Sequence, residues 1–235
     1  MRNLIFILLI TPLFLIGQAK NSNNYQDDLL NNTGLELRIN YKTENKGTPY
    51  LYDEWKEGYL VINDSVISPQ KKIQIDLEKG ELIVGIGEGR GTIIDDKAIT
   101  GFAITKDNSI NKHLYARLEP MQFEDSDRTS HFYEVVSNFQ KSDYLIKEEQ
   151  KYLYDPNKSR GYQTENSFPM EWKKRTYYYI KNSSDKYVKT KLNKKAILKV
   201  LADKSREMKS YVGSRKINFK KEEDVVKVLV YYHSL

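Results

Sequence analysis

The residues of this chain best suited to binding a ligand lie in one short run of its C-terminal half. The candidate binding residues are Trp172, Lys173, Lys174, Arg175, Tyr177 and Tyr179. Aromatic side chains on a basic strand can stack against sugars or bases, while neighbouring cations hold phosphates. A structural alternative assigns the aromatics to packing, with Tyr178 in the core and Tyr177 and Tyr179 covering a neighbouring strand.

Motifs for catalysis and metal binding are weak throughout the chain. The three histidines, His113, His131 and His233, do not occur in a zinc-binding spacing, and no serine lies in a G-x-S-x-G turn. The absence of cysteine excludes Cys-ligated zinc and iron–sulfur centres. The sequence therefore predicts no catalytic residue, no metal and no cofactor.

A glycine-rich run, Gly85–Gly91, is the most conspicuous local motif. It follows an expected strand, as a phosphate-binding turn would, but Arg90 occupies the place of the third glycine and no helix follows. The run is therefore interpreted as a glycine-rich hairpin, with a bulge as an option.

Charge is distributed unevenly along the chain, whose formal net charge is +6. Residues 20–140 carry 14 Lys or Arg against 20 Asp or Glu, whereas residues 141–235 carry 23 against 12. The basic half suits an anionic partner such as lipopolysaccharide, a phospholipid surface or nucleic acid. Alternatively, the lysines cover the solvent-exposed faces of ordinary strands and helices, or the two halves neutralise each other.

The elements that must position these residues are mostly short strands. Apolar residues alternate with polar ones, as at Ile73, Ile75 and Leu77, and polar turns recur about every ten residues. The expected strands cover 35–39, 59–62, 73–77, 81–86, 93–94, 98–105, 114–118, 132–139, 143–154, 175–181 and 187–192. This spacing predicts an antiparallel β domain over 35–192, a meander that closes into a sandwich or open barrel.

The last 43 residues, 193–235, change to a helical period. Apolar positions predict one helix over 193–212, with Asn193 as its N-cap, and a second over 220–232, capped by Asn218. The second helix should bury Val225, Val228, Leu229 and Tyr232. The fold class is therefore α+β and β-rich, with a C-terminal two-helix hairpin packed on the β domain.

The N-terminus has the pattern of a secretory signal peptide over residues 1–19. Arg2 precedes an apolar stretch from Leu4 to Ile16, and Gly17 and Ala19 supply the small residues of a cleavage site. The polar segment 20–34 is expected to be a disordered tail. After cleavage the chain is expected to have no transmembrane span, and without cysteine it carries no lipid anchor.

Several short motifs are spread along the chain, namely Gly47–Trp55 with Gly58, then Gly101-Phe102, Lys194–Leu198, Asn218–Asp224 and the ending Tyr231–Leu235. Together they resemble the motifs of a family of uncharacterised exported proteins of Gram-negative bacteria. The resemblance covers most of the chain after the signal peptide. It implies export and one recurring domain, and it implies no activity and no catalytic residues.

These observations predict a non-enzymatic exported envelope protein, periplasmic or extracellular and at most peripheral to the outer membrane. Its role would be binding or assembly toward an anionic envelope polymer, a lipid surface or a protein partner, and nucleic acid is not expected. The alternative is an exported hydrolase acting on glycans or peptides, with a carboxylate pair or His131 at its centre. A further option is an accessory subunit whose acidic half docks another copy or a partner.

Overall fold

The computed structural model describes residues 35–95, 97–105, 112–125, 130–136, 143–158 and 168–235. In these residues the protein is β-rich, with twelve strands in one sheet and three α-helices in the C-terminal part. The expected signal peptide and tail, residues 1–34, lie outside the described residues. No helix of the described part is long and apolar enough to cross a membrane.

Eleven of the twelve strands overlap those expected from the alternating apolar pattern; β3 was not expected, and residues 137–139 of the expected strand 132–139 lie outside the described residues. Their bounds are β1 Glu36–Arg38, β2 Lys56–Ile62, β3 Val66–Ile67, β4 Lys71–Asp76, β5 Glu81–Gly87, β6 Arg90–Ile94, β7 Ile99–Thr105, β8 Lys112–Leu118, β9 His131–Val135, β10 Leu145–Tyr154, β11 Glu171–Lys181 and β12 Tyr187–Thr190. The largest extension is at β11, which begins at Glu171 and therefore includes the whole candidate binding run.

The strands form one antiparallel sheet in the order β1-β6-β5-β4-β2-β7-β8-β9-β10-β11-β12, with β3 beside β2. From β7 to β12 the order is the expected meander, but after β6 the chain crosses to the other side of β2. The sandwich or barrel expected from the sequence is not confirmed, because the sheet is open. Strand alternation fixes which residues share a face, whereas it says nothing about whether the outermost strands meet.

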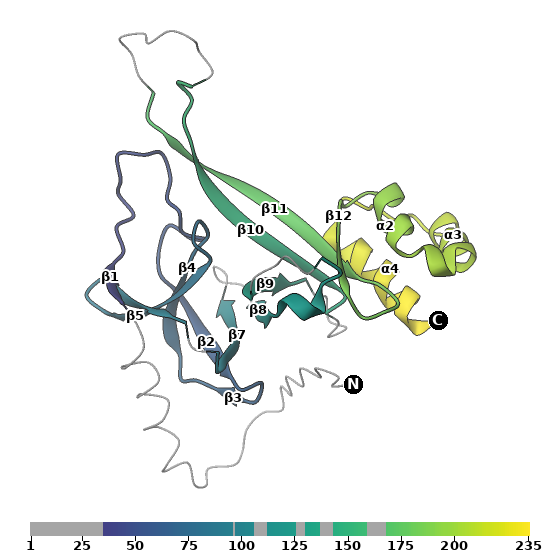
Figure 1. The fold of residues 1–235 in the computed structure, drawn as a ribbon, viewed down its shortest axis with the longest axis horizontal. Coiled ribbons are helices and arrows are strands. Elements are labelled where there is room, and N and C mark those ends of the chain that lie inside the picture. The colour runs from purple at the N-terminus through teal and green to yellow at the C-terminus, as the bar shows by residue number, and fades with distance from the viewer. Residues whose placement is uncertain (1–34, 96, 106–111, 126–129, 137–142, 159–167) are drawn as a thin grey trace, which may run out of the picture.

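The two ends of the sheet have separate cores on the same face. At one end, strands β2 to β8 bury Leu60, Ile73, Leu82, Phe102 and Tyr115. At the other end, the helices cover Leu145 of β10 and Ile180 of β11. Figure 1 shows the curled strands on one side, the helices on the other, and the long strands β10 and β11 running between them. The opposite face carries an aromatic cluster around Tyr133, Tyr179 and Tyr187.

The helical part departs from the expected hairpin. Three helices are present, α2 Lys194–Val200, α3 Ser205–Gly213 and α4 Glu222–Ser234, because a short 3-10 turn at Ala202–Lys204 divides the expected first helix. Asn193 is confirmed as an N-cap, since its side chain accepts a hydrogen bond from Ala196 N. Asn218 is not the cap of α4, whose N-cap residue is Lys221.

The apolar face expected for α4 is confirmed. Its buried residues include Val225, Val228, Leu229 and Tyr232. Glu222, Glu223 and Asp224 lie in its first turn, where carboxylates oppose the positive end of the helix dipole.

The glycine-rich run is a bulged hairpin between β5 and β6, as the sequence indicated. The register shifts between Gly85 and Gly87, and the turn residues Gly87, Glu88 and Gly89 all have positive φ. A Cβ at Gly91 would lie 2.7 Å from Cη2 of Trp55 and 2.6 Å from Cγ2 of Ile83. The glycine at 91 therefore makes room for an indole ring, and the run has a structural role.

The candidate binding surface

The six candidate residues lie on β11, which pairs with β10 along ten residue pairs from Leu145↔Ile180 to Tyr154↔Glu171. We call this long hairpin the arm. Successive side chains of a strand point to opposite faces. Lys173, Arg175, Tyr177 and Tyr179 therefore share one face, and Trp172 and Lys174 lie on the other. The six residues do not form a single surface.

Burial removes one more candidate from the surface. Tyr179 is only 1% exposed and belongs to the aromatic cluster with Tyr133 and Phe123. Its hydroxyl donates a hydrogen bond of 2.7 Å to Glu148 Oε2. Tyr179 therefore packs inside the aromatic cluster and does not reach a ligand. This is the packing alternative that the sequence left open.

The residues on the other face are engaged with the rest of the protein. Trp172 N donates to the carbonyl oxygen of Lys46 at 2.9 Å, and Lys174 Nζ lies 2.8 Å from Glu149 Oε1. The first contact ties the backbone of the arm to Lys46, and the second neutralises Lys174 within the arm. Lys174 therefore contributes no free cation to an anion-binding face.

Three cations on the first face each lie over a tyrosine ring. Lys173 Nζ is 3.6 Å from the ring centroid of Tyr154, and Arg175 Cζ is 3.9 Å from that of Tyr152. Lys189 of β12 places Nζ 3.7 Å from the ring centroid of Tyr177. A cation in this position is attracted by the electron-rich ring face and loses part of its conformational freedom. We call Lys173, Arg175 and Lys189 the cation row.

The cation row keeps its charge available. Among the residues that the structure describes, none of its members has a carboxylate oxygen within 4 Å. The neighbouring Glu148 carboxylate accepts hydrogen bonds from Tyr179 and from the amide of Gln150 instead. A hydrogen bond with the Tyr152 side chain raises the pKa of Arg175 further above its usual range.

This geometry changes the chemistry expected of the aromatic residues. The rings of Tyr152, Tyr154 and Tyr177 are half-buried and carry a cation on one face, so they support the charges rather than stack against a sugar. The surface is therefore suited to anions. Sequence reasoning missed Lys189, Tyr152 and Tyr154, because their contribution depends on the register between three strands. The alternation Tyr152-x-Tyr154 was the available signal.

A second polar cluster lies inside the molecule, between the sheet and α4. The carboxylate of Glu134 (β9) lies 2.8 Å from His113 Nδ1 and 3.0 Å from Lys147 Nζ. Lys147 Nζ lies 3.6 Å from Glu222 Oε1 of α4, which also accepts a 2.8 Å hydrogen bond from the Tyr178 hydroxyl. This cluster links strands β8 to β11 with a helix.

The pKa shifts in the cluster favour a charged Glu134 carboxylate beside a charged Lys147 ammonium group. Burial by itself would raise the pKa of Glu134, but hydrogen bonds and charge from His113 and Lys147 lower it below its usual value. Burial opposes the charge of Lys147, yet Glu134 and Glu222 raise its pKa above the usual value. Burial and the hydrogen bond to Glu222 raise the pKa of Tyr178, which therefore stays protonated.

A small cavity adjoins this cluster. Its volume is about 20 Å³, and His131, Glu134, Lys147 and Glu149 line it together with apolar residues such as Leu51. This is room for about one water molecule. The cavity is lined by His131 and two glutamates, the residue types that the hydrolase alternative would use, but it does not admit a sugar ring or a peptide.

The remaining histidines have packing contacts. His131 makes an edge-to-face contact with Tyr133 and lies against Gly80, and His233 stacks on Tyr144 at 3.9 Å. Within the described ranges no group of three or more His, Asp or Glu residues is placed to hold a metal ion.

Comparison with known proteins adds no relative to this picture. No protein-family model, no curated protein and no solved structure matches the chain. The resemblance to exported proteins of Gram-negative bacteria stays a prediction from the sequence motifs.

Proposed function

We propose that this chain is a non-enzymatic exported protein that binds anionic material of the cell envelope through the cation row of the arm. The observation that carries the proposal is the arrangement of Lys173, Arg175 and Lys189, each over a tyrosine ring and each without a carboxylate partner among the described residues.

The arrangement suits an extended anionic ligand. Lys173 and Arg175 are two residues apart on β11, which separates their backbone positions by about 7 Å along the strand. Lys189 follows over Tyr177, the next residue on that face. Three cations in line provide several weak contacts that add up along a polymer or a charged surface, and added salt screens each of them.

The binding test compares two variants with the same change in charge. One replaces the cation row (Lys173→Gln, Arg175→Gln, Lys189→Gln), and the control replaces three exposed lysines of α2 (Lys194→Gln, Lys195→Gln, Lys199→Gln). The probe is immobilised dextran sulfate, eluted with a salt gradient. Far-ultraviolet circular dichroism confirms that both variants remain folded.

We expect the unchanged protein and the α2 variant to elute at similarly high salt, whereas the cation-row variant elutes much earlier. Each lost contact should lower the slope of log affinity against log salt by roughly 0.7–0.9. Equal elution of the two variants, or no retention of the unchanged protein at low salt, would refute the proposal.

Export is part of the proposal and has its own test. The sequence supports it through the apolar stretch Leu4–Ile16 and the small residues before Lys20. In a Gram-negative host, the protein should appear in the periplasm or medium with Lys20 as its N-terminal residue. Retention in the cytoplasm with Met1 intact would contradict it.

Assembly with a protein partner or with further copies is an alternative form of the same role. The acidic front half and the basic back half could neutralise each other between molecules. Mass measurement of the purified protein over a salt series distinguishes this case, since a salt-sensitive dimer would hide the cation row. Crosslinking in intact cells would identify a captured partner.

A further inference from the structure

The outer edge of β11, on the side away from β10, is only partly covered by other strands. At one end Trp172 N donates to the carbonyl oxygen of Lys46 at 2.9 Å. At the other end Tyr178 pairs with Thr190 of β12, and Figure 1 shows β12 beside only the helix-side end of β11. Between these two contacts, none of the described residues pairs with this edge. We call the uncovered stretch, residues 173–177, the edge gap.

The backbone groups of two residues point outward from the edge gap. Lys151 of β10 pairs with Lys174, and Lys151 N points away from β11, since it donates to the carbonyl oxygen of Leu77. In an antiparallel ladder both members of such a pair turn their N–H and C=O groups away from each other. Lys174, and Thr176 two positions further along, therefore present these groups at the outer edge. In the part of the chain that the structure describes, no acceptor is bonded to either N–H group.

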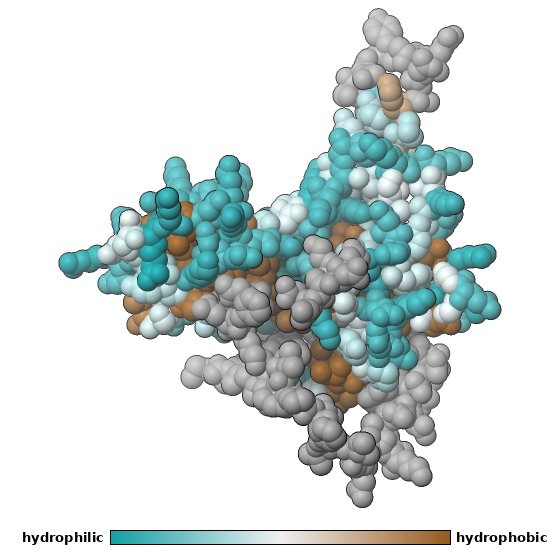
Figure 2. Space-filling model, turned by 180° about the vertical axis from the view of Figure 1, so that it is seen from behind, coloured by the Kyte–Doolittle hydropathy of each residue, from teal (hydrophilic) through white to brown (hydrophobic). Residues whose placement is uncertain are grey.

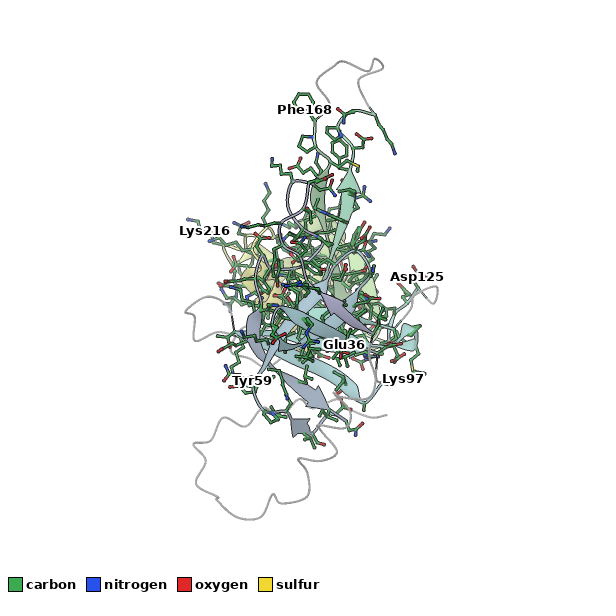
Figure 3. All side chains as sticks on the ribbon, turned by 90° about the vertical axis from the view of Figure 1, so that its left-hand side faces the viewer. Glu36, Tyr59, Lys97, Asp125, Phe168 and Lys216 are labelled. Atoms are coloured by element: carbon green, nitrogen blue, oxygen red, sulfur yellow. The ribbon has the colours of Figure 1, made fainter. Side chains whose placement is uncertain are left out.

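The edge gap can be approached from solvent. Lys174, Arg175 and Thr176 are all exposed. Figure 3 shows the arm projecting from the body of the sheet toward the labelled Phe168, and Figure 2 shows hydrophilic side chains along the arm on the face in view. An exposed edge with unpaired backbone groups is a template for a further strand.

The length of the edge gap limits what can fill it. Trp172 and Tyr178 are six positions apart, which corresponds to about 20 Å of extended chain. Because both ends are covered, the gap has room for about five residues of one added segment. The arm of a second copy, with its ten residue pairs, is too long to lie between the covered ends. Edge-to-edge pairing of two copies would also place like charges opposite each other.

The charge on the strands that border the edge gap is positive. Lys173 and Arg175 share one face of β11, and Lys189 lies over the ring of Tyr177 on that face. In an added strand, the residue opposite Arg175 lies on the same face, with its Cβ about 5 Å from that of Arg175. This distance is within the reach of an arginine side chain and a carboxylate.

The acids around the edge gap offset this charge only in part. Glu149 lies 2.8 Å from Lys174 Nζ and Glu171 lies 3.2 Å from Lys46 Nζ, so both are paired. The exposed acids belong to other segments, whereas the cation row belongs to β11 and β12 themselves. Two further acids accept hydrogen bonds from tyrosine hydroxyls, Glu148 and Glu222, and two are exposed, Glu44 and Glu223.

We infer that the edge gap binds an extended acidic segment of a partner protein, which adds to β11 as a short antiparallel strand. The inference rests on the proposed function and names its partner. The outward groups of Lys174 and Thr176 bond the backbone of the segment, which is the usual source of affinity in strand addition. Side chains share a face at every second residue, so acids at alternate positions of the segment meet Lys173, Arg175 and the cation over Tyr177.

The probe is a peptide of about five residues in which glutamate alternates with valine and both ends are blocked. The control peptide has the same glutamates, but proline replaces each valine. In the expected register the valine N–H groups donate to the carbonyl oxygens of Lys174 and Thr176, so proline removes these donors and keeps the charge. Binding is measured on the purified full chain by titration of its amide NMR signals.

Thr176→Pro removes one outward N–H group of the edge gap. The hydrogen bonds to β10 are expected to remain, because the N–H of Thr176 does not point toward that strand. Thr176→Val is the matched control and keeps the N–H group. We expect about a tenfold loss of affinity for the glutamate–valine peptide in Thr176→Pro and no loss in Thr176→Val. Both variants should be retained on dextran sulfate like the unchanged protein.

Amide exchange in the unchanged protein gives a second measurement that needs no variant. With the glutamate–valine peptide at about ten times its Kd, exchange at Lys174 and Thr176 should slow by about tenfold. Exchange at Lys173 and Arg175 should change little, because their N–H groups already face β10. If Thr176→Pro does not fold, this measurement decides.

The outcomes separate the two proposals. Equal binding of the two peptides, or unchanged exchange at Lys174 and Thr176, overturns strand addition, while retention on dextran sulfate preserves the proposed function. Binding of neither peptide also overturns it, and the lysines of this edge then protect it from pairing. If the cation-row variant elutes from dextran sulfate like the unchanged protein, the proposed function fails and this inference fails with it.

Discussion

At the scale of single residues, two glycines of the β5–β6 hairpin are explained by the aromatic ring that packs on them. Gly85 and Gly91 lie opposite each other in the β5–β6 hairpin, and the ring of Trp55 lies over both. This contact explains a glycine pattern that superficially resembles a phosphate-binding turn. The space beside these glycines is filled by the indole ring of Trp55 rather than by a phosphate.

Replacing Gly91 with alanine is expected to destabilise the protein by about 1–3 kcal/mol, because its Cβ would press on Trp55 and Ile83. The control is Gly213→Ala at the end of α3, where a Cβ meets nothing within 4 Å. That change should be neutral or stabilise by up to about 1 kcal/mol. Urea unfolding measures both, and equal stability of the two variants would show that Gly91 is not sterically required.

At the scale of elements, α4 is attached to the sheet by a polar connection within an apolar interface. Lys147 of β10 bridges Glu134 of β9 and Glu222 of α4. Its side chain is 13% exposed, so loss of this cation leaves a mostly buried carboxylate poorly compensated.

We therefore expect Lys147→Met to cost about 3 kcal/mol of unfolding free energy. Lys46→Met is the control, because Lys46 pairs with Glu171 at the surface, where the two side chains are 73% and 37% exposed. Its loss should cost less than about 1 kcal/mol. Adding Glu134→Gln to Lys147→Met should recover part of the lost unfolding free energy, because it removes the uncompensated carboxylate. If the effects of the two substitutions simply add, Glu134 and Lys147 do not interact as argued.

The same helix gives the protein a pH dependence through His233. Burial lowers the pKa of His233 below 6.5, and the charges of Lys181 and Lys204 act in the same direction, while the Lys181 carbonyl and Asp185 oppose it. The unfolded chain therefore binds this proton more readily than the folded protein. Stability contributed by neutral His233 is lost as the pH falls below about 6.5 and levels off below the folded pKa.

His233→Phe keeps a ring against Tyr144 and removes the titration. We expect the unfolding free energy of this variant to change less between pH 7 and pH 5 than that of the unchanged protein. Denaturant titrations at three pH values measure the slope. The Glu134 contribution falls in a separate window below pH 4.5, because its folded pKa is lowered and its stabilisation is lost on protonation. If the unfolding free energies of the variant and the unchanged protein change equally with pH above pH 5, His233 is not the cause of the pH dependence.

At the scale of the whole molecule, the arm is held against the curled end of the sheet. Lys151 N of β10 donates to the carbonyl oxygen of Leu77 at 3.1 Å, and its ammonium group donates to the carbonyl oxygens of Thr48 and Tyr50. Figure 1 shows the arm crossing from the helices to this region. A single lysine therefore links residues that are about a hundred positions apart in the chain.

Lys151→Met should loosen this attachment without unfolding either core. Hydrogen bonds from a charged group contribute about 1.5–3 kcal/mol, so amide exchange in residues 46–51 and 151–154 is expected to accelerate by about 10- to 100-fold. Exchange in α4 should not change. Lys209→Met, on the exposed side of α3, is the control. If amide exchange in these residues is as slow in the Lys151 variant as in the unchanged protein, backbone contacts alone hold the arm.

The sequence by itself determined the local elements of this protein. The alternation at Ile73, Ile75 and Leu77 located β4 to within two residues at each end, and the helical period identified four of the five buried residues of α4. Burial of one face imposes its period on neighbouring residues. The sequence also located the basic aromatic strand, although it assigned residues from both faces to one surface.

Only the tertiary structure decided that the sheet is open, that Tyr179 is buried, and that Lys189 completes the cation row. It also decided that Lys151 joins the arm to Thr48 and Tyr50. These features depend on strand register and on contacts between residues far apart in the chain. No local period encodes them, since they follow from the packing of the whole sheet.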